Sequence, residues 1–386
     1  MKKWMFFCAV LSVCAAGAAT FVDVTGVGVE KKHFTIGVTG AGAEAYAKTL
    51  RRNLELTGCF VAGEPAALKI TGAIGGTVTA TGLGKSLSAP TPAGDEKALR
   101  MAARRMSDAI CKAYTDQEGF ACDRVAFISR KGPSNSELGI GYPDGQDVRL
   151  VTSDGKAAVG PRWKDADTLF YTGFLNGGPQ VWELNTAMGK RNLRWSFKGL
   201  ATGAAISPDG AYAAIILSFQ GNPELYVIDL AANKWRRLTN TPMASEGQPT
   251  WSPDGRRIVY VSDETRHPQL YVIDVATKAK RRVTSKGSQN VDPDWGPDGR
   301  VAYITKRGGV SQVAVMDPDA GDAAATLVTE PGSWEHPSWS RDRRHLVAGR
   351  DKALFVVDTL PKDKGGDAPR QMFMANGNWI TPSWSR

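Results

Sequence analysis

Residues 247–299 read GQPTWSPDGRRIVYVSDETRHPQLYVIDVATKAKRRVTSKGSQNVDPDWGPDG, and this stretch decides the fold. It holds two copies of one pattern, a tryptophan followed by a Pro-Asp-Gly turn, at Trp251 and Trp295. Between the copies lie two apolar runs, RIVYVSD and LYVID, and a basic run, KRRVT, each the length of one β-strand. A unit of this length with about four strands is typical of a β-propeller blade.

The same pattern extends along most of the chain. An apolar residue, which we call the anchor, recurs every 43 to 45 residues, at Trp163, Ile206, Trp251, Trp295, Trp339 and Trp384. In the Pro-Asp-Gly turns the proline fixes φ, the aspartate can bond the local backbone, and the glycine can take a positive φ. Turn chemistry therefore explains the repeated aspartates, and the anchors are expected to fill the wedge between neighbouring blades rather than to catalyse a reaction.

The two ends of the repeat indicate how the propeller closes. Trp384 has no strand after it, and the apolar run at 124–129 has no anchor before it. We therefore expect the C-terminal run ITPSWS to supply the inner strand of the first blade. This closes six blades and leaves no open sheet edge at the join.

The first residues predict export. Residues 1–18 have two lysines, a short apolar run and small residues that fit an A-x-A cleavage site, so the mature chain is expected to begin at Ala19 or Thr20. The alternative is a lipoprotein signal that ends at Cys14. A cleaved leader implies export, and we expect a periplasmic protein. No later apolar run approaches the ~18 residues that span a bilayer.

Residues 19–120 lack the repeat and predict a small α/β domain. A strand is expected at 33–38, a helix from Glu44 to Thr57, two strands within 67–81, and a helix from Asp95 to about Thr115. The Pro- and Ser-containing stretch at 85–94 predicts a loop. Residues 121–386 then form the propeller, so the fold class is mainly β.

Composition narrows the function. The chain carries a net charge of +9, and loss of Lys2 and Lys3 with the leader lowers it to +7. The basic residues recur as pairs rather than as one block, so no nucleic-acid groove is predicted. An oxidising compartment permits one disulfide among Cys59, Cys111 and Cys122, and the sequence leaves the pairing open. Without CxxC spacing, no zinc site is expected.

With its leader, small α/β domain and six blades, the chain resembles the TolB family of the Tol–Pal envelope system. The residues that carry the resemblance are those at 247–299, and it extends over residues 121–386. It implies a non-enzymatic, monomeric adaptor between a Pal-like peptidoglycan-associated lipoprotein and TolA, which acts in envelope integrity and cell division.

The resemblance also implies two binding regions. Pal is expected on the propeller face formed by the loops before the anchors, which here offers Glu246, Gln248, Gln289, Asn290, Asp292, Trp334, Glu335 and His336. Trp334 lies outside the anchor column and has no evident packing role in the repeat, which favours it as an interface residue. TolA is expected on the mature N-terminus, at Phe21, Val22, Asp23 and Val24, whose alternating pattern suits strand addition.

Three other functions stay open at this point. A serine hydrolase with similar blades would need a G-x-S-x-G elbow, which the sequence lacks. A propeller that binds glycan or metal in its channel could hold a structural calcium ion on Asp292, Asp294 and Glu335, although no cofactor is required. A TolB-like paralogue could bind another envelope protein.

Overall fold

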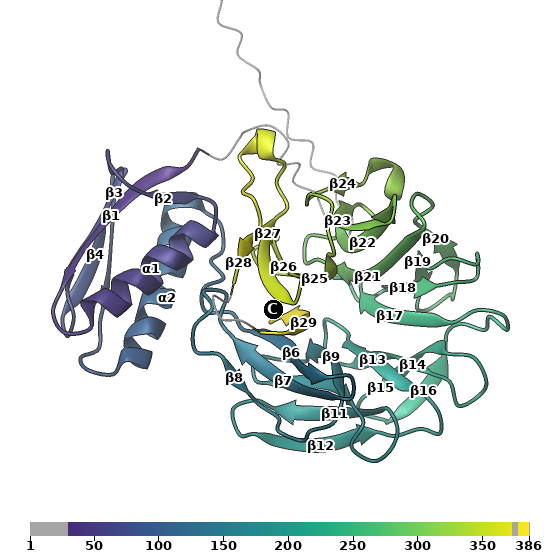
Figure 1. Cartoon of the computed structure of the whole chain (residues 1–386). Coiled ribbons are helices and arrows are strands. Elements are labelled where there is room, and N and C mark those ends of the chain that lie inside the picture. The colour runs from purple at the N-terminus through teal and green to yellow at the C-terminus, as the bar shows by residue number, and fades with distance from the viewer. Residues whose placement is uncertain (1–29, 373–376, 386) are drawn as a thin grey trace, which may run out of the picture.

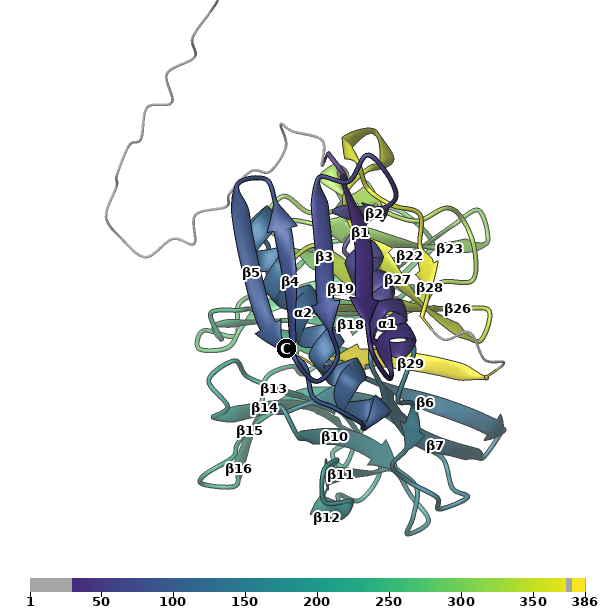
Figure 2. The same ribbon diagram turned by 90° about the vertical axis from the view of Figure 1, so that its left-hand side faces the viewer.

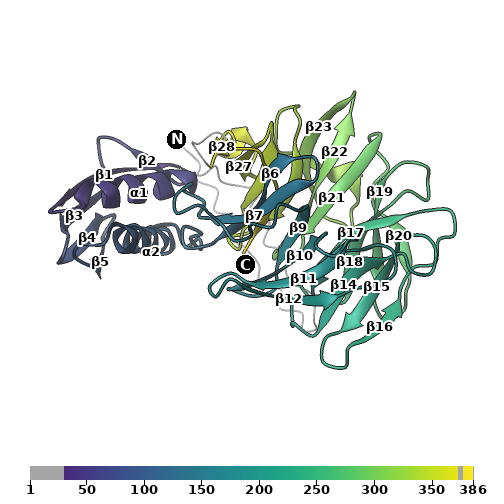
Figure 3. The same ribbon diagram turned by 60° about the horizontal axis from the view of Figure 1, so that its bottom comes forward.

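The computed structural model describes residues 30–372 and 377–385. Six four-stranded antiparallel sheets surround a central channel, and a small α/β domain packs against one side of this ring (Figure 1). The view turned by 60° shows the α/β domain standing beside the propeller, next to blades 1 and 6 (Figure 3). The predicted leader at 1–18 and the segment Phe21–Val24 lie outside the described residues.

Each blade has its inner strand at the channel and its last strand at the rim. From the channel outward, the strands are β29 (Trp379–Trp384), β6 (Val125–Gly132), β7 (Asn135–Gly141) and β8 (Arg149–Leu150) in blade 1; β9 (Ala158–Trp163), β10 (Thr168–Gly173), β11 (Gln180–Asn185) and β12 (Lys190–Trp195) in blade 2; and β13 (Ala201–Ile206), β14 (Tyr212–Leu217), β15 (Glu224–Asp229) and β16 (Lys234–Arg237) in blade 3.

The other three blades repeat this order. They contain β17 (Glu246–Trp251), β18 (Arg257–Ser262), β19 (Gln269–Asp274) and β20 (Lys280–Arg282) in blade 4; β21 (Gln289–Trp295), β22 (Val301–Arg307), β23 (Val310–Met316) and β24 (Thr326–Leu327) in blade 5; and β25 (Glu335–Trp339), β26 (His345–Arg350), β27 (Ala353–Asp358) and β28 (Arg370–Gln371) in blade 6. Short 3₁₀ helices, η1 (Asp322–Ala324) and η2 (Lys362–Lys364), precede the last strands of blades 5 and 6.

The expected closure is confirmed. β29 pairs antiparallel with β6, with Trp384 opposite Val125 and Trp379 opposite Ser129. The C-terminal strand thus completes the sheet that begins after the α/β domain. Because the first blade takes strands from both ends of the propeller, no inner edge stays open.

The anchors join each blade to the one before it. The indole nitrogens of three anchors donate to the carbonyl of the residue that precedes the previous anchor: Trp163 to Ser383 at 3.0 Å, Trp251 to Ala205 at 3.0 Å, and Trp339 to Asp294 at 3.1 Å. The rings also fill the apolar space between sheets. The wedge role predicted for the anchors therefore includes a directed hydrogen bond.

The α/β domain is a five-stranded sheet covered on one face by two helices. Its elements are β1 (Lys32–Thr39), α1 (Ala43–Leu56), β2 (Phe60–Ala62), β3 (Leu68–Ala73), β4 (Thr77–Gly82), β5 (Lys85–Pro90) and α2 (Glu96–Thr115), with the strand order β2-β1-β3-β4-β5. Figure 2 shows the sheet in front of its helices, so the helices lie between the sheet and the propeller.

Most elements expected in this domain are present, and one prediction is wrong. Asp95 caps α2, because its carboxylate accepts from the amides of Lys97 and Ala98. The stretch at 85–94 is not all loop, since β5 runs through its first half. Leu83 and Gly84 both have positive φ, which gives a tight hairpin that returns the chain along β4.

A buried ion network fixes the α/β domain to blade 1. Arg104 of α2 is fully buried and donates to both oxygens of Asp144, at 2.8 and 3.1 Å, and to Asp147 at 2.8 Å. Its guanidinium lies 3.8 Å from the centre of the Tyr142 ring. On the blade 6 side, Arg370 of β28 donates to the Glu55 carbonyl of α1 at 2.7 Å. Because the buried Arg104 is paired with carboxylates across the contact, it helps to hold the two parts in one relative position.

Cys59, Cys111 and Cys122 are free thiols in this structure. Cys59 lies at the domain contact, where its sulfur accepts from Arg344 at 3.3 Å. Within residues 30–372 and 377–385, neither helix is long and apolar enough to cross a membrane.

Candidate binding site at the channel mouth

Every inner strand carries a β-bulge three residues before its anchor. At each bulge the register between the inner and the second strand shifts, and one residue takes a left-handed backbone conformation. These six residues and their φ angles are Gly160 (58°), Gly203 (73°), Gln248 (51°), Asp292 (53°), His336 (47°) and Thr381 (47°). Five of the six precede a proline, and Gly203 precedes Ala204.

This ring of bulges is an unusual place to find large side chains. A left-handed φ costs little for glycine, but more for Gln, Asp and His, and most for a β-branched residue such as Thr381. Such strain gathers at functional sites. We call this end of the channel, with the loops that lead into the inner strands, the mouth, and the opposite end, beside the turns that follow the anchors, the turn end.

Three bulge residues form a hydrogen-bonded chain across blades 4, 5 and 6. Gln248 donates through Nε2 to Asp292 Oδ1, and its Oε1 accepts from the Asp292 amide at 2.9 Å. Asp292 Oδ2 accepts from the His336 amide at 3.1 Å, and the His336 ring lies 3.1 Å from Oδ1. The bulges hold these side chains against one another from strands that lie 44 residues apart in sequence.

The charges at the mouth stabilise one another. Burial lowers the pKa of His336, but the carboxylate of Asp292 outweighs burial and raises that pKa above its ordinary value. Burial opposes the charge of Asp292 in turn, and His336 still holds the pKa of Asp292 below its ordinary value. Burial raises the pKa of Glu335, which comes directly before His336. The charged groups at the mouth thus shift one another's pKa values, and a charged ligand bound there would shift them further.

The predicted contact residues fall into groups according to how many residues they stand before the anchor of their strand. Gln248, Asp292 and His336 stand three residues before an anchor and contact one another across neighbouring blades. Glu246, Asn290 and Trp334 stand five residues before an anchor, where all six blades have a buried residue. They are 4%, 0% and 2% exposed. The prediction that these three present their side chains to a partner is therefore wrong, because strand geometry turns them between blades.

Trp334 has the packing role that the sequence did not reveal. Its ring meets Phe355 edge-on at 5.5 Å, the Arg350 guanidinium lies 5.3 Å from its centre, and its indole nitrogen donates to Glu330 at 2.9 Å. It belongs to the core between blades 5 and 6. In blade 1 the equivalent position is Trp379, and this correspondence is the signal that could have identified Trp334 as a core residue.

Glu246 and Asn290 serve the structure in the same way. Asn290 donates to Gln269 Oε1 and to the Lys286 carbonyl, both at 2.8 Å. Glu246 accepts from the Thr241 hydroxyl at 2.5 Å. Burial, reinforced by the nearby carboxylate of Glu224, raises the pKa of Glu246 to about 7.

The structure therefore brings together part of the predicted site. Gln248, Asp292 and His336 form one cluster, and Gln289 and Glu335 are half-buried at the starts of β21 and β25. Residues that the sequence analysis missed complete the ring: Gly160, Gly203 and Thr381. Counting three residues back from every anchor would have found them.

The predicted calcium ligands in the channel, Asp292 and Asp294, already accept hydrogen bonds from the protein. Hydrogen-bond donors engage both oxygens of Asp292, and Asp294 Oδ2 accepts from the Trp339 amide at 2.7 Å. Among the described residues, no group of three or more His, Cys, Asp or Glu side chains could hold a metal ion. Bound calcium stays a prediction, and no later step depends on it.

The fold and the mouth define a class of protein, a six-bladed propeller with a ring of strained polar residues at one end of its channel and a small α/β domain at its side. Residues 111–386 match the family described as the TolB beta propeller domain. The chain belongs to this family.

Similar proteins agree with the family match. The Tol-Pal system protein TolB of Anaeromyxobacter dehalogenans is 29% identical over 255 residues, which span 56% of this chain and 57% of that protein. The protein of the same name from Gluconobacter oxydans is 28% identical over 146 residues, 37% of this chain and 32% of that protein. The aligned parts thus span about a third and just over half of the relatives' lengths. The crystal structure of TolB from Acinetobacter baumannii superposes with a TM-score of 0.78 at 22% identity, covering 94% of this chain and 98% of that one, and it shows the same fold.

Proposed function

We propose that this protein is a non-enzymatic periplasmic adaptor of the Tol–Pal system, and that its mouth binds a Pal-like peptidoglycan-associated lipoprotein. The family match and the names of the relatives support the system. The observation that supports this face is the bulge ring, which holds Gln248, Asp292 and His336 in fixed, strained positions. Such a preorganised polar platform loses little side-chain freedom when a partner docks.

The arrangement of the histidines favours binding over catalysis. Within the described residues, two histidines pair with aspartates, His336 with Asp292 at 3.1 Å and His345 with Asp342 at 2.5 Å. Neither ring is hydrogen-bonded to a serine or cysteine side chain of the described part, so neither pair extends to a nucleophile. An adaptor role needs only a stable surface, which the closed propeller provides.

The mature N-terminus supplies the second contact of the proposal. Phe21, Val22, Asp23 and Val24 would pair with TolA as an added strand. Deletion of residues 20–24 should abolish binding of the soluble TolA domain and leave binding of the Pal-like domain within about threefold. Equal TolA binding by the shortened protein would contradict this contact.

Calorimetric titration with the soluble domain of the same organism's Pal-like lipoprotein tests the mouth. Glu335→Gln and Gln289→Ala should each weaken binding about three- to thirtyfold, because they change half-buried side chains at the mouth. Arg256→Gln, an exposed change beside a turn at the other end, is the matched control. Trp334→Ala is unsuitable here, since it opens a cavity in the core.

The alternative is a TolB-like propeller that binds another envelope protein or a glycan through the same mouth. A well-folded sample that binds neither the Pal-like domain nor TolA would favour this alternative. Pull-down with the wild-type protein, compared with Glu335→Gln, would then identify the partner.

A further inference from the structure

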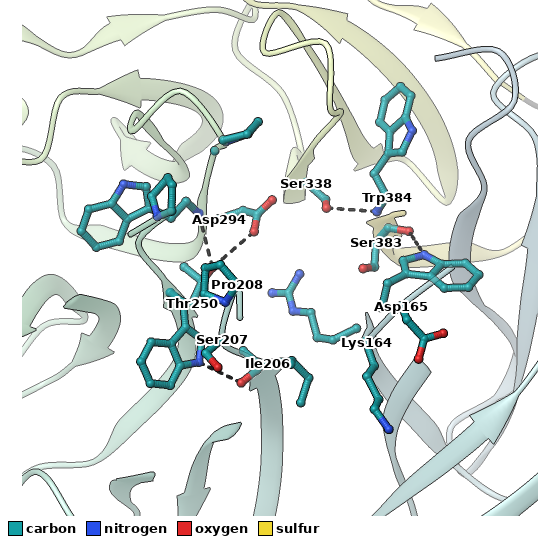
Figure 4. A pocket seen from close by; sticks show the side chains of 18 residues that line it. Lys164, Asp165, Ile206, Ser207, Pro208, Thr250, Asp294, Ser338, Ser383 and Trp384 are labelled. Carbon is teal, nitrogen blue, oxygen red and sulfur yellow. Dashed lines mark hydrogen bonds between the residues drawn. The ribbon is translucent and has the colours of Figure 1, made fainter. Parts of the chain in front are cut away.

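The turn end of the channel holds a cavity of about 400 Å³. Its wall includes the residue directly before each anchor, so all six inner strands contribute one residue: Arg162, Ala205, Thr250, Asp294, Ser338 and Ser383. Figure 4 shows Thr250, Asp294, Ser338 and Ser383 around this opening, with Pro208 and Ile206 nearby. The volume falls within the range of small-molecule sites.

This ring contains three hydroxyl groups and one carboxylate beside Arg162. Asp294 accepts from the Trp339 amide at 2.7 Å and lies 3.5 Å from the Thr250 hydroxyl. Ser338 Oγ accepts from the Trp384 amide at 3.1 Å, so its own proton remains available. The Ser383 hydroxyl makes no hydrogen bond to the described residues. The two serines thus offer O–H groups to whatever occupies the cavity.

Arg162 supplies the positive charge. It is half-buried in β9, and its guanidinium forms no hydrogen bond or ion pair with any residue in 30–372 or 377–385. Several other propeller arginines pair with a carboxylate, and these are Arg124, Arg191, Arg257, Arg300 and Arg344. A guanidinium with all its donors free at a cavity wall matches an anion.

We propose that the turn end of the channel binds a monocarboxylate, with the Arg162 guanidinium on both carboxylate oxygens and the Ser338 and Ser383 hydroxyls as further donors. The planar fork of arginine fits a carboxylate in two parallel hydrogen bonds. One arginine balances one negative charge, which matches a monocarboxylate better than a dianion such as phosphate. Tryptophan and proline side chains on the wall would cover the apolar part of the ligand.

The carboxylate could come from a free small acid or from the C-terminus of a peptide that enters at the turn end. Ligand-observed NMR on the mature protein distinguishes these sources, with N-acetylglycine and acetyl-Ala-Ala-Ala as the probes. The amides of both probes serve as controls. Saturable binding of either acid supports the proposal, and the tighter probe identifies the source. The amides should bind at least about tenfold more weakly.

Variants test the assignment of residues. Arg162→Gln should weaken binding of the acid at least about tenfold, and Ser383→Ala about two- to fivefold. Lys164→Gln is the matched control, because Lys164 also lines the cavity but is paired with Glu183 at 2.5 Å. It should leave binding within about twofold. The thermal melting of each variant establishes that it is folded.

A second readout does not depend on affinity. The charge of Arg162 lowers the pKa of His336, so a carboxylate that neutralises Arg162 should raise this pKa, as Arg162→Gln should. NMR titration of the His336 ring measures the shift. Equal binding of acid and amide, an unchanged affinity in Arg162→Gln, or no saturable binding up to about 20 mM would each overturn the proposal.

Discussion

The mouth and the turn end are formed by the same six inner strands, yet the two ends of these strands differ in packing and in backbone conformation. At the turn end five of the six anchors are tryptophans, four of them are buried, and three join the blades through indole hydrogen bonds. At the mouth the backbone is strained and its side chains differ from blade to blade. The difference teaches that the regular end carries stability, which lets the other end hold strained residues for recognition.

Removal of β29 should break this arrangement most completely. Deletion of residues 379–386 takes the inner strand from blade 1 and exposes the pairing edge of β6. We expect loss of the cooperative unfolding transition, measured by circular dichroism during heating. Deletion of Arg386 alone, which leaves β29 intact, is the control. A truncated protein with an unchanged melting temperature would show that closure does not hold the ring.

Loss of one anchor should be the next largest effect. Trp339 is fully buried, and its indole donates to the Asp294 carbonyl. Trp339→Ala should lower the free energy of unfolding by about 3–5 kcal/mol, measured in urea, because it leaves a large cavity. Met243→Ala, at a side chain that is 96% exposed, should change it by less than about 0.5 kcal/mol. Similar values for the two variants would contradict the role given to the anchors.

The buried carboxylate of Glu246 should lower the stability of the fold by an amount that depends on pH. Burial raises its pKa to about 7, so the folded protein binds this proton more tightly than the unfolded chain does. The carboxylate therefore destabilises the fold increasingly as the pH rises from the unfolded pKa of about 4.5 to about 7. Glu246→Gln should stabilise the protein by about 1–3 kcal/mol at pH 8 and have little effect near pH 4.

Urea unfolding at several pH values measures this difference. Glu264→Gln, at an exposed carboxylate that pairs with Lys280, is the control and should change stability by less than about 1 kcal/mol at each pH. If Glu246→Gln lost stability at pH 8, the buried carboxylate would be a favourable part of the fold, against this account.

A change at His336 should have the smallest effect. Protonated His336 stabilises the fold, whereas deprotonated Glu246 destabilises it. The side chain is about 30% exposed, and its raised pKa reflects the charge of Asp292. The ion pair therefore adds stability below the unfolded histidine pKa of about 6.5, and this stability is lost as the pH rises through the higher folded pKa. The ion pair is thus expected to make stability depend weakly on pH.

The variant His336→Asn tests this, because Asn tolerates left-handed φ. The wild type should be more stable than this variant by less than about 1 kcal/mol at pH 6, and the difference should disappear at higher pH. A gap that does not change with pH would contradict the ion pair.

How far the sequence predicts this molecule depends on the kind of feature. The anchor spacing gives the six blades, and the unpaired run at 124–129 gives the closure, because both follow from counting repeats. The prediction fails for Trp334, Glu246 and Asn290, since adjacent residues in one loop lie on different sides of the inner strand. The bulges add to this difficulty, as each shifts the alternation by one residue. Arg162 was missed because a free guanidinium is recognised only when its surroundings are known.

Site-specific photo-crosslinking tests most directly whether the mouth is the recognition end. A photoreactive residue would replace Gln289 at the mouth or Arg256 near the turn end, in the mature protein mixed with the Pal-like soluble domain. The account predicts a crosslinked complex from position 289 and none from position 256. A complex from position 256, with none from position 289, would contradict the assignment of the Pal-like partner to the mouth.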